Sequence, residues 1–298
     1  MKFKRVGLIA SLALPTVIRS LEMLEQFLTA RGVEVLFEEH TADIAGTEQA
    51  GLPVEDLGPQ IDLAIVVGGD GSLLSAARAL VNFDVPLLGV NRGRLGFLTD
   101  ILPNEIDQRV GQVLNGHYHT SARTLLEVSV HRGDREISRG SALNDVVLHP
   151  GESVRMMEFE LYINDRLVYT QNSDGLIIAT PTGSTAYALS AGGPIVHPEM
   201  DAIVVVPLNP HTLSNRPIVV SGSSRIEIVV GSRNMLHPLV TCDGQDDILS
   251  VPGDRIRITQ LEKFLSIIHP EEHNFYEVCR SKLGWASRLD SDFNQTGE

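Results

Sequence analysis

The sequence is poor in the residues that mark secreted, zinc-bound or nucleic-acid-binding proteins. Its two cysteines, Cys242 and Cys279, lie far apart and outside any Cys-x-x-Cys pattern. This excludes a disulfide framework and a structural zinc cluster and indicates a reducing compartment, so we expect a cytoplasmic protein. Lysine and arginine total 24 against 38 aspartates and glutamates, a formal net charge of −14. We therefore expect no nucleic-acid partner and no anionic lipid surface.

Long hydrophobic runs are also missing. No apolar stretch reaches the roughly 18 residues that a bilayer-spanning helix needs, so we expect no membrane partner. The apolar run Val6–Leu14 follows Lys2, Lys4 and Arg5 and imitates a short signal peptide, but no small-residue cleavage site follows. We interpret it as a first strand, Phe3–Ile9. The 298 residues are 43% hydrophobic, enough for one large globular domain or two ordinary ones.

The first 120 residues alternate strand and helix patterns. Apolar residues at helical spacing in Val17–Leu28 predict a first helix, with Thr16 as its N-cap. The nearly all-apolar run Ile61–Val67 is typical of a central parallel strand. The other elements we predict are strands at Val33–Phe37 and Val85–Val90, helices at Ser72–Val81 and Asn104–Leu114, and a loop at Ala42–Gly58. The alternation predicts an α/β domain over residues 1–120 with a parallel, Rossmann-like sheet.

The apolar period then changes to two. From residue 121 onward, apolar and polar residues alternate as in Leu126–Val130, and short strand-like runs follow one another with turn residues between them. We therefore predict an all-β, sandwich-like second domain over residues 121–270, with one helical stretch near Ser184–Ser190. Residues 271–298 are expected to form a helical tail that packs back on the α/β domain.

The first candidate site is the turn Gly68-Gly69-Asp70-Gly71, between a predicted buried strand and a predicted helix. Ligands of open α/β sheets bind at this end of the strands, and glycines let the backbone approach a phosphate. The turn carries an acid where phosphate-binding loops usually carry a lysine. Such a carboxylate either holds a metal ion or accepts the proton of an attacking hydroxyl. Alternatively, Asp70 only caps the helix of a tight turn.

Two further segments combine apolar strands with polar side chains. Ser173–Tyr187 runs from an apolar strand into a turn rich in hydroxyls, where Thr182 or Ser184 could cap a helix whose free N–H groups face a ligand. A plain connecting turn is the alternative. Asn144-Asp145 interrupts an apolar run, and its polar groups must be satisfied if buried. A ribose diol would satisfy them, but the spacing favours a β-bulge or a hairpin turn.

Weaker signals lie elsewhere in the chain. Arg92 and Arg94 follow a predicted strand and either meet a phosphate at the sheet edge or are solvated. His117 and His119 lie in a polar stretch with no third ligand nearby in the sequence, so we interpret them as surface histidines. The segment 243–245, Asp-Gly-Gln, indicates a turn whose amide could contact a ligand.

Taken together, these segments resemble the NAD kinase family, and most closely its bacterial members. The resemblance covers nearly the whole chain, and the stretch Asp174–Tyr187 is its most specific motif. The segments that follow the family's order and spacing are Gly-Gly-Asp-Gly at 68–71, Asn-Arg-Gly-x-Leu-Gly-Phe-Leu at 91–98, Asn144-Asp145, Asp174–Tyr187, Ala-Gly-Gly-Pro at 191–194, Asp-Gly-Gln at 243–245 and Lys-Leu-Gly-Trp at 282–285.

The resemblance implies transfer of a phosphoryl group from ATP to the adenosine 2′-hydroxyl of NAD, giving NADP. It also implies a divalent metal, expected to be Mg²⁺, although it names no metal ligand in this chain. It further implies a cytoplasmic homo-oligomer, either a dimer or a tetramer. A lipid or sugar kinase on the same scaffold, or a sensor that binds NAD(P)(H) without turnover, are the alternative functions.

The resemblance also assigns roles to residues. Asp70 would be the general base, and the N–H groups of Gly68, Gly69 and Gly71 would contact phosphates. Asn144 and Asp145 would hold a ribose of NAD. The residues implied to bind the rest of the dinucleotide are Asp174, Thr185, Ala186, Tyr187 and Ser190, with Arg155, Asn172 and Gln245 at further contact positions. Position 172 varies among related enzymes, so the resemblance assigns no preference between NAD and NADH.

Overall fold

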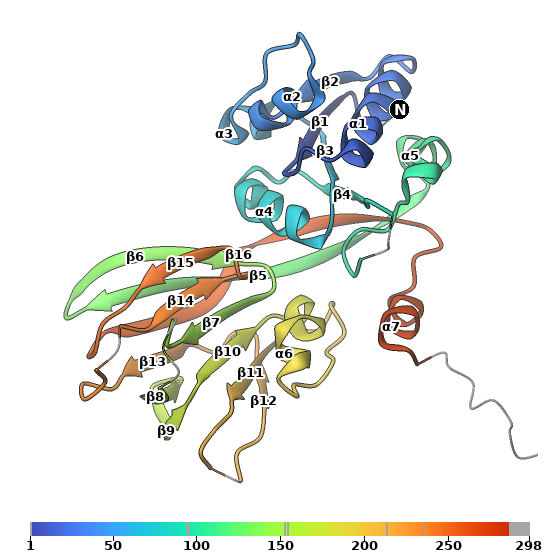
Figure 1. Cartoon of the computed structure of the whole chain (residues 1–298). Coiled ribbons are helices and arrows are strands. Elements are labelled where there is room, and N and C mark those ends of the chain that lie inside the picture. Colours follow the sequence, from blue (N-terminus) through green and yellow to red (C-terminus); the bar gives the residue numbers. More distant parts are fainter. Residues whose placement is uncertain are drawn as a thin grey trace, which may run out of the picture.

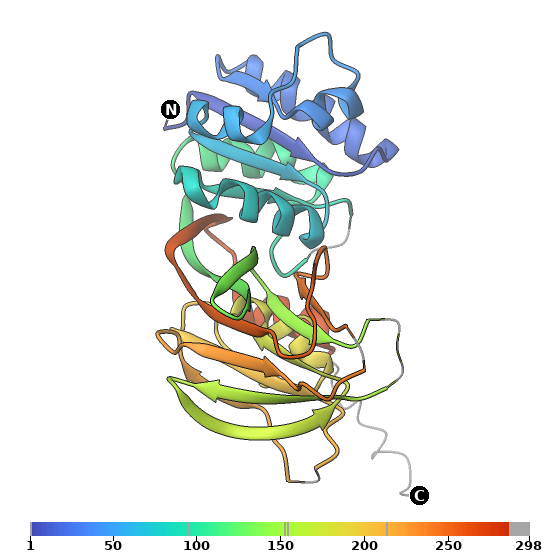
Figure 2. The ribbon, with the colours of Figure 1, turned by 90° about the vertical axis from the view of Figure 1, so that its left-hand side faces the viewer.

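The computed structural model describes residues 2–93, 96–151, 153, 155–212, 214–235 and 237–285. An α/β region and a β-sandwich region follow one another along the long axis of the molecule (Figure 1; Figure 2). Residues 286–298 of the expected tail lie outside the described residues. Within the part of the chain that is described, no helix is long and apolar enough to cross a membrane.

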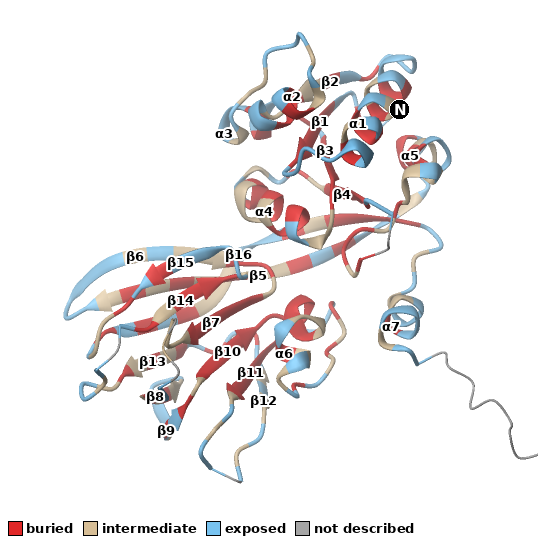
Figure 3. Cartoon of the chain, in the orientation of Figure 1, coloured by how far each residue is buried: buried red, intermediate tan, exposed pale blue. Residues whose placement is uncertain are grey.

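Four short parallel strands form the sheet of the α/β region. They are β1 (Arg5–Ala10), β2 (Glu34–Phe37), β3 (Leu63–Val67) and β4 (Leu87–Val90), in the order β2-β1-β3-β4. Leu63, Ile65 and Val67 of β3 pack with α1 (Pro15–Thr29) and α5 (Ile106–Leu114), whereas Ala64 and Val66 pack with α4 (Asp70–Leu80). Helices therefore cover both faces of the sheet, and β3 is buried along its whole length (Figure 3).

Local capping forms one helix that apolar spacing did not predict. The prediction of a loop over residues 42–58 is wrong, because the structure has α2 (Glu39–Ala45), α3 (Val54–Leu57) and a 3-10 turn at Gly58–Gln60 there. The Glu38 carboxylate accepts hydrogen bonds from the N–H groups of His40 and Thr41, and Gly46 ends α2 in the left-handed conformation. A helix of seven residues that depends on its caps shows little apolar periodicity.

The start of α1 also differs from the prediction. Leu14 occupies the N-cap position, and Pro15 is the first helical residue, so Thr16 is not the cap. Proline suits this position because its fixed φ is helical and its missing N–H would have no partner there. The proline therefore fixes where the helix begins.

Two long strands join the regions into one continuous sheet. β5 (Tyr118–Arg132) and β16 (Arg255–Pro270) pair antiparallel along their length, and the end of β16 pairs parallel with β4 through Ile267 and Ile268. The sheet order is therefore β2-β1-β3-β4-β16-β13-β8-β9, where β13 is Ile226–Val230, β8 is Met157–Ile163 and β9 is Arg166–Ser173. The strand β6 (Arg135–Ala142) pairs with β5. The strand β16 is continuous through an irregularity of its pairing with β5 between Gln260 and Phe264.

A second, antiparallel sheet completes the sandwich. Its order is β12-β11-β10-β7-β14-β15, with bounds β7 (Asp145–His149), β10 (Gly175–Ala179), β11 (Ala202–Leu208), β12 (Ile218–Ser221), β14 (Leu239–Cys242) and β15 (Asp246–Leu249). The facing strands of the long sheet are β6 (Arg135–Ala142), β8 (Met157–Ile163), β9 (Arg166–Ser173) and β13 (Ile226–Val230). The predicted fold class, an α/β domain and a sandwich-like all-β domain, is confirmed. The strands β6 and β15 were not predicted.

Three short 3-10 helices and one terminal helix complete the described elements. The 3-10 helices are η2 (Val81–Phe83), η3 (Pro103–Glu105) and η4 (Thr182–Thr185), the last leading into α6 (Tyr187–Ser190). The terminal helix α7 (Phe275–Leu283) begins at Asn274, whose side chain accepts the N–H groups of Tyr276 and Glu277, and ends at left-handed Gly284. The described part of the expected C-terminal tail thus contains one helix, over Phe275–Leu283.

We expect Phe159→Ala to destabilise the sandwich. Phe159 is fully buried between the two sheets, and truncating a buried phenylalanine to alanine typically costs about 3–5 kcal/mol. Phe264→Ala is the matched control, because the Phe264 side chain is 56% exposed. Equilibrium urea unfolding measures both, and equal losses in the two variants would contradict the assigned core.

Candidate functional site

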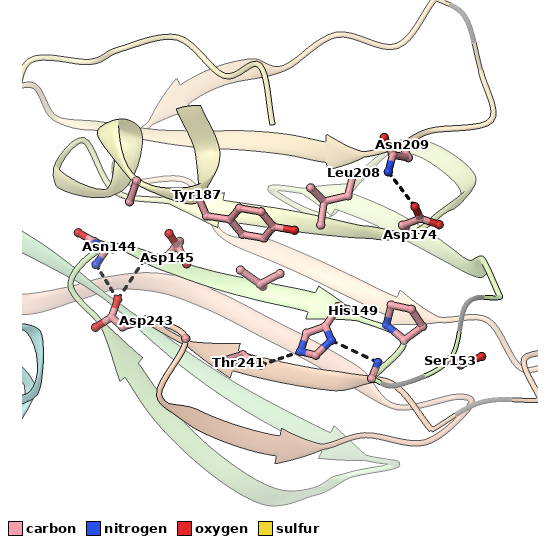
Figure 4. A pocket seen from close by; sticks show the side chains of 15 residues that line it. Asn144, Asp145, His149, Ser153, Asp174, Tyr187, Leu208, Asn209, Thr241 and Asp243 are labelled. Carbon is pink, nitrogen blue, oxygen red and sulfur yellow. Dashed lines mark hydrogen bonds between the residues drawn. The ribbon is translucent and has the colours of Figure 1, made fainter. Parts of the chain in front are cut away.

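A cavity of about 730 Å³ lies on the outer face of the second sheet, beside α6 (Figure 4). Along β7, Val146 and Leu148 face the sandwich core, whereas Val147 points outward into the cavity. The lining comes from β7, β11, β14, α6 and the adjoining turns. It consists of Asn144, Asp145, Val147, His149, Pro150, Gly151, Ser153, Asp174, Ala186, Tyr187, Leu208, Asn209, Thr241, Asp243 and Gly244. Its size is that of a small-molecule or cofactor site.

The buried carboxylate of Asp243 organises the inner end of the cavity. Its Oδ1 accepts the N–H groups of Asn144 at 2.7 Å and Asp145 at 3.2 Å, and its Oδ2 accepts that of Leu143 at 3.0 Å. Arg78 of α4 donates to the same Oδ2 at 3.0 Å. A carboxylate with no exposed surface is stable only with such partners, so Asp243 fixes the chain where β6 ends and β7 begins.

The connection at Asn144-Asp145 is neither a bulge nor a hairpin turn. It carries the chain from β6 in the long sheet to β7 in the second sheet. Burial, and then the negative charge of Asp243, raise the pKa of Asp145 to about 7. The side chains of Asn144 and Asp145 line the cavity, so their polar groups are available to a ligand.

The hydroxyl-rich turn packs directly against this connection. Thr180 Oγ1 donates to the carbonyl of Leu143 at 2.5 Å, and the N–H of Thr180 donates to the carbonyl of Asn144 at 2.8 Å. A Cβ on Gly183 would lie 2.0 Å from the carbonyl oxygen of Asn144, so only glycine fits there. Ser184 is buried and bonds the backbone of Pro181 and Val196, which makes it a structural hydroxyl.

The rim of the cavity carries Tyr187 and Asp174. Tyr187 is the first residue of α6, it is 49% exposed, and its side chain lines the cavity (Figure 4). Asp174 accepts a hydrogen bond from Asn209 Nδ2 at 2.8 Å on the opposite rim. An exposed aromatic ring opposite a carboxylate–amide pair provides a stacking surface and polar contacts for one ligand.

His149 is a cavity residue that the sequence analysis missed. Its Nδ1 accepts the N–H of Gly151, so its Nε2 carries the proton and donates to Thr241 Oγ1 at 2.7 Å. Thr241 in turn donates to Asp247 Oδ1 at 2.6 Å. The partners lie on a neighbouring strand, about a hundred residues away in sequence, so no local motif marked this chain of hydrogen bonds.

Asp70 lies in a second cavity, of about 600 Å³, at the N-terminus of α4. Its carboxylate accepts the N–H groups of Phe97 at 2.8 Å and Leu98 at 3.2 Å and the hydroxyl of Thr99 at 3.1 Å. A Cβ on Gly96 would lie 1.9 Å from Asp70 Oδ1, so this glycine makes room for the carboxylate. The loop 96–99 therefore holds the Asp70 carboxylate. Asp70 does not cap α4, because Gly69 is the N-cap and no side chain accepts a capping hydrogen bond.

Cations line the same cavity as Asp70. Arg92 and Lys282 contribute to its lining with Gly69, Asn91 and Gly93. Arg92 is exposed and lies at this sheet edge, whereas Arg94 lies outside the described residues. A guanidinium and an ammonium beside a glycine turn suit a phosphate group.

Gln245 joins the glycine turn to the first cavity. Its Nε2 donates to the carbonyl of Gly71 at 2.9 Å, and its Oε1 accepts from Ser75 at 2.6 Å. Asp243 and Gly244 have positive φ angles of 53° and 64°, as in the tight hairpin turn that the Asp-Gly pair predicts. This turn places Gln245 against α4 and Asp243 in the first cavity, so the contact between Gln245 and Gly71 is a junction between the two sites.

The structure brings some of the predicted site residues together and not others. Asn144, Asp145, Asp174, Ala186 and Tyr187 line the first cavity, and Gly69 and Asp70 line the second. Among the described residues, the linings of these two cavities do not include Gly68, Gly71, Arg155, Asn172, Thr185, Ser190 or Gln245. Gly71 and Gln245 lie at the junction, while Arg155 and Asn172 are exposed farther along the sandwich.

The α/β region carries a glycine turn with an acidic residue, and the β-sandwich carries a cavity of the size that a cofactor needs. Together they define a two-domain nucleotide-binding protein. Comparisons with known proteins agree. Models of the ATP-NAD kinase N-terminal and C-terminal domains match residues 6–118 and 143–269. An NAD kinase of Teredinibacter turnerae is 58% identical over 288 residues, which are 96% of this chain and 98% of the relative.

Two solved structures share the whole fold. Yeast NADH kinase complexed with NADH has a TM-score of 0.87 at 27% identity and covers 97% of this chain and 90% of its own. An NAD kinase from Archaeoglobus fulgidus in complex with ATP has a TM-score of 0.74 at 25% identity, covering 95% and 100%. The chain belongs to the NAD kinase family, whose members phosphorylate NAD to NADP, and it is a kinase.

We expect Asp145→Asn to change how stability depends on pH. The pKa of Asp145 is raised from 3.8 to about 7 in the folded state, so the folded protein binds this proton more tightly than the unfolded chain. The wild type therefore loses stability relative to the variant as pH rises from 3.8 towards 7. Thermal unfolding across this range measures the difference. Asp84→Asn, at an exposed position, is the control, and a pH-independent difference for Asp145→Asn would contradict the assignment.

Proposed function

We propose that this chain phosphorylates the adenosine 2′-hydroxyl of NAD, with Asp70 as the general base. One observation carries the proposal: Gln245 ties the glycine turn of Asp70 to the turn whose Asp243 organises the larger cavity. The two cavities then have separate tasks at one junction. The larger cavity takes the dinucleotide, and the cavity of Asp70 takes the ATP phosphates.

The dinucleotide contacts follow from the polarity of the larger cavity. The ribose whose 2′-hydroxyl reacts would bond Asn144 and Asp145, whose backbone is held in place by Asp243. Tyr187 offers its ring face to an aromatic base, while Asp174 and Asn209 contribute polar contacts from the other rim. Yeast NADH kinase, which is similar over nearly the whole chain, was solved with NADH bound.

Phosphoryl transfer depends mainly on positioning and on neutralising charge. The three donors from Phe97, Leu98 and Thr99 hold the Asp70 carboxylate still, and an ionised carboxylate with about four lone-pair sites can still accept the proton of a substrate hydroxyl. Arg92 and Lys282 offset the charge of the phosphates. These residues provide the base and the cations of the reaction.

The divalent metal comes with the ATP phosphates. Asp70 is the one carboxylate among the described residues that line its cavity, so this chain offers no cluster of oxygen ligands there. ATP as its magnesium complex fits such a site, because the phosphates supply most of the ligands. The similar NAD kinase from A. fulgidus was solved in complex with ATP, which supports ATP as the nucleotide.

We infer a cytoplasmic homo-oligomer, a dimer or a tetramer. Both cysteines are free and buried, as a reducing compartment allows. The edge strand β9 exposes Leu167 by 56% and Val168 by 41%, and the edge strand β12 exposes Val219 by 47%. Exposed apolar residues on sheet edges favour contact with a second copy of the chain.

Asp70→Asn is expected to lower kcat by at least about 100-fold, because general base catalysis typically contributes 10²–10⁴-fold. NAD affinity should change little, since Asp70 does not line the larger cavity. Steady-state kinetics and calorimetry measure the two quantities. Asp84→Asn, a surface aspartate just beyond the other end of α4, is the matched control. Wild-type turnover in Asp70→Asn would refute the role of this carboxylate.

Tyr187→Ala is expected to raise KM for the dinucleotide several-fold and to leave KM for ATP nearly unchanged. The ring lines the larger cavity, so its loss removes a stacking surface from NAD alone. Initial rates with each substrate varied in turn separate the two constants. A larger effect on ATP than on NAD would place the two substrates the other way round.

A further inference from the structure

The loop that holds Asp70 is fixed from its other side by the next residue along the chain. Asp100 directly follows Thr99, whose hydroxyl donates to Asp70. Asn91, at the end of β4, donates to Thr99 Oγ1 at 2.7 Å, so the loop is also tied to the sheet. A shift of Asp100 would therefore move the loop 97–99, which provides the three hydrogen-bond donors to Asp70.

Two histidines from the C-terminal part of the chain bind Asp100. His273 Nδ1 lies 3.1 Å from Asp100 Oδ1, and His269 Nδ1 is hydrogen-bonded to Oδ2. The two rings stack with centroids 4.1 Å apart. Burial opposes the charge of Asp100, but hydrogen bonds from both histidines hold its pKa below its usual range. His269, at the end of β16, is fully buried, so the contact has little freedom to move.

The contacts of His269 favour a hydrogen-bonded clamp over a metal site. The ligand atoms of Asp100, His269 and His273 lie within 4.8 Å of one another, close enough for an ion. However, Arg123 Nη2 lies 3.4 Å from His269 Nε2, and a guanidinium can only donate. Nε2 therefore accepts, and the ring proton sits on Nδ1, facing Asp100. An ion on Nδ1 would force that proton towards the buried guanidinium.

We propose that Asp100, clamped by His269 and His273, is a positioning residue for phosphoryl transfer. It keeps the backbone of Phe97 and Leu98 and the hydroxyl of Thr99 where they hold the Asp70 carboxylate. The inference rests on the proposed role of Asp70 as the base. It assigns a task in the reaction to the end of β16 and to the segment before α7, neither of which contributes to the lining of the dinucleotide cavity.

Asp100→Asn tests the proposal. Its side-chain amide can accept from one histidine but presents a donor to the other, so the clamp opens on one side. We expect kcat to fall about 10- to 100-fold, because a displacement of about 1 Å can cost 10²-fold in rate. KM for NAD and for ATP should stay within about twofold. Unchanged kcat, or a rise in KM that accounts for the loss, would overturn the proposal.

Asp254→Asn is the matched control for general destabilisation. The Asp254 side chain is 1% exposed and accepts hydrogen bonds from Arg132 and from the N–H of Val251, within the sandwich and away from Asp70. Its loss should lower the unfolding temperature without lowering kcat at 25 °C. If both variants lose kcat equally, Asp100 has a structural role only. His273→Gln, at a partly exposed position, provides a milder opening of the clamp and should lower kcat in the same direction.

The double variant Asp70→Asn/Asp100→Asn separates this proposal from the one it rests on. If Asp100 acts through Asp70, adding Asp100→Asn to Asp70→Asn should lower kcat no further. A further fall would show that Asp100 acts by another route, even with Asp70 as the base. A rise in the unfolding temperature of EDTA-treated protein on adding Zn²⁺, lost in His273→Gln, would replace the clamp with a metal site.

Discussion

The hydrogen bonds of the Asp243 carboxylate are the constraint on which the rest of the site depends. This one buried carboxylate accepts hydrogen bonds from three consecutive backbone N–H groups, from Leu143 to Asp145, and from the side chain of Arg78 in α4. It thereby sets the point where the chain leaves one sheet for the other and ties that point to the helix that begins at Asp70. Its left-handed backbone, followed by Gly244, also directs Gln245 towards the glycine turn.

The continuous sheet supports this arrangement. Because β16 pairs with β4 at one end and with β13 and β5 in the sandwich, the α/β region and the sandwich share backbone hydrogen bonds. Two substrates bound to different regions can then be held with their reacting atoms at the distance and orientation that phosphoryl transfer needs. The end of β16 also provides His269, so the same strand reaches the loop around Asp70.

Much of the fold and part of the site could be predicted from the sequence. The all-apolar β3 and the alternating β5 carry their period in local residues, and the glycines around Asp70 mark the turn. The helix α2 depends on a single capping carboxylate, and the strand β15 depends on a hairpin partner, so neither had a strong local pattern. Asp243 and His149 act through partners about a hundred residues away, and such pairs form only once the sheets are assembled.

The most direct measurement is an end-point assay for NADP. Purified protein is incubated with ATP, Mg²⁺ and NAD, and the product is detected with a dehydrogenase that accepts NADP and not NAD. The account predicts NADP in proportion to the ATP consumed, because the cavity of Asp145 presents a ribose hydroxyl to Asp70. Calorimetric binding of NAD without any NADP formed would contradict it and would indicate a protein that senses the dinucleotide.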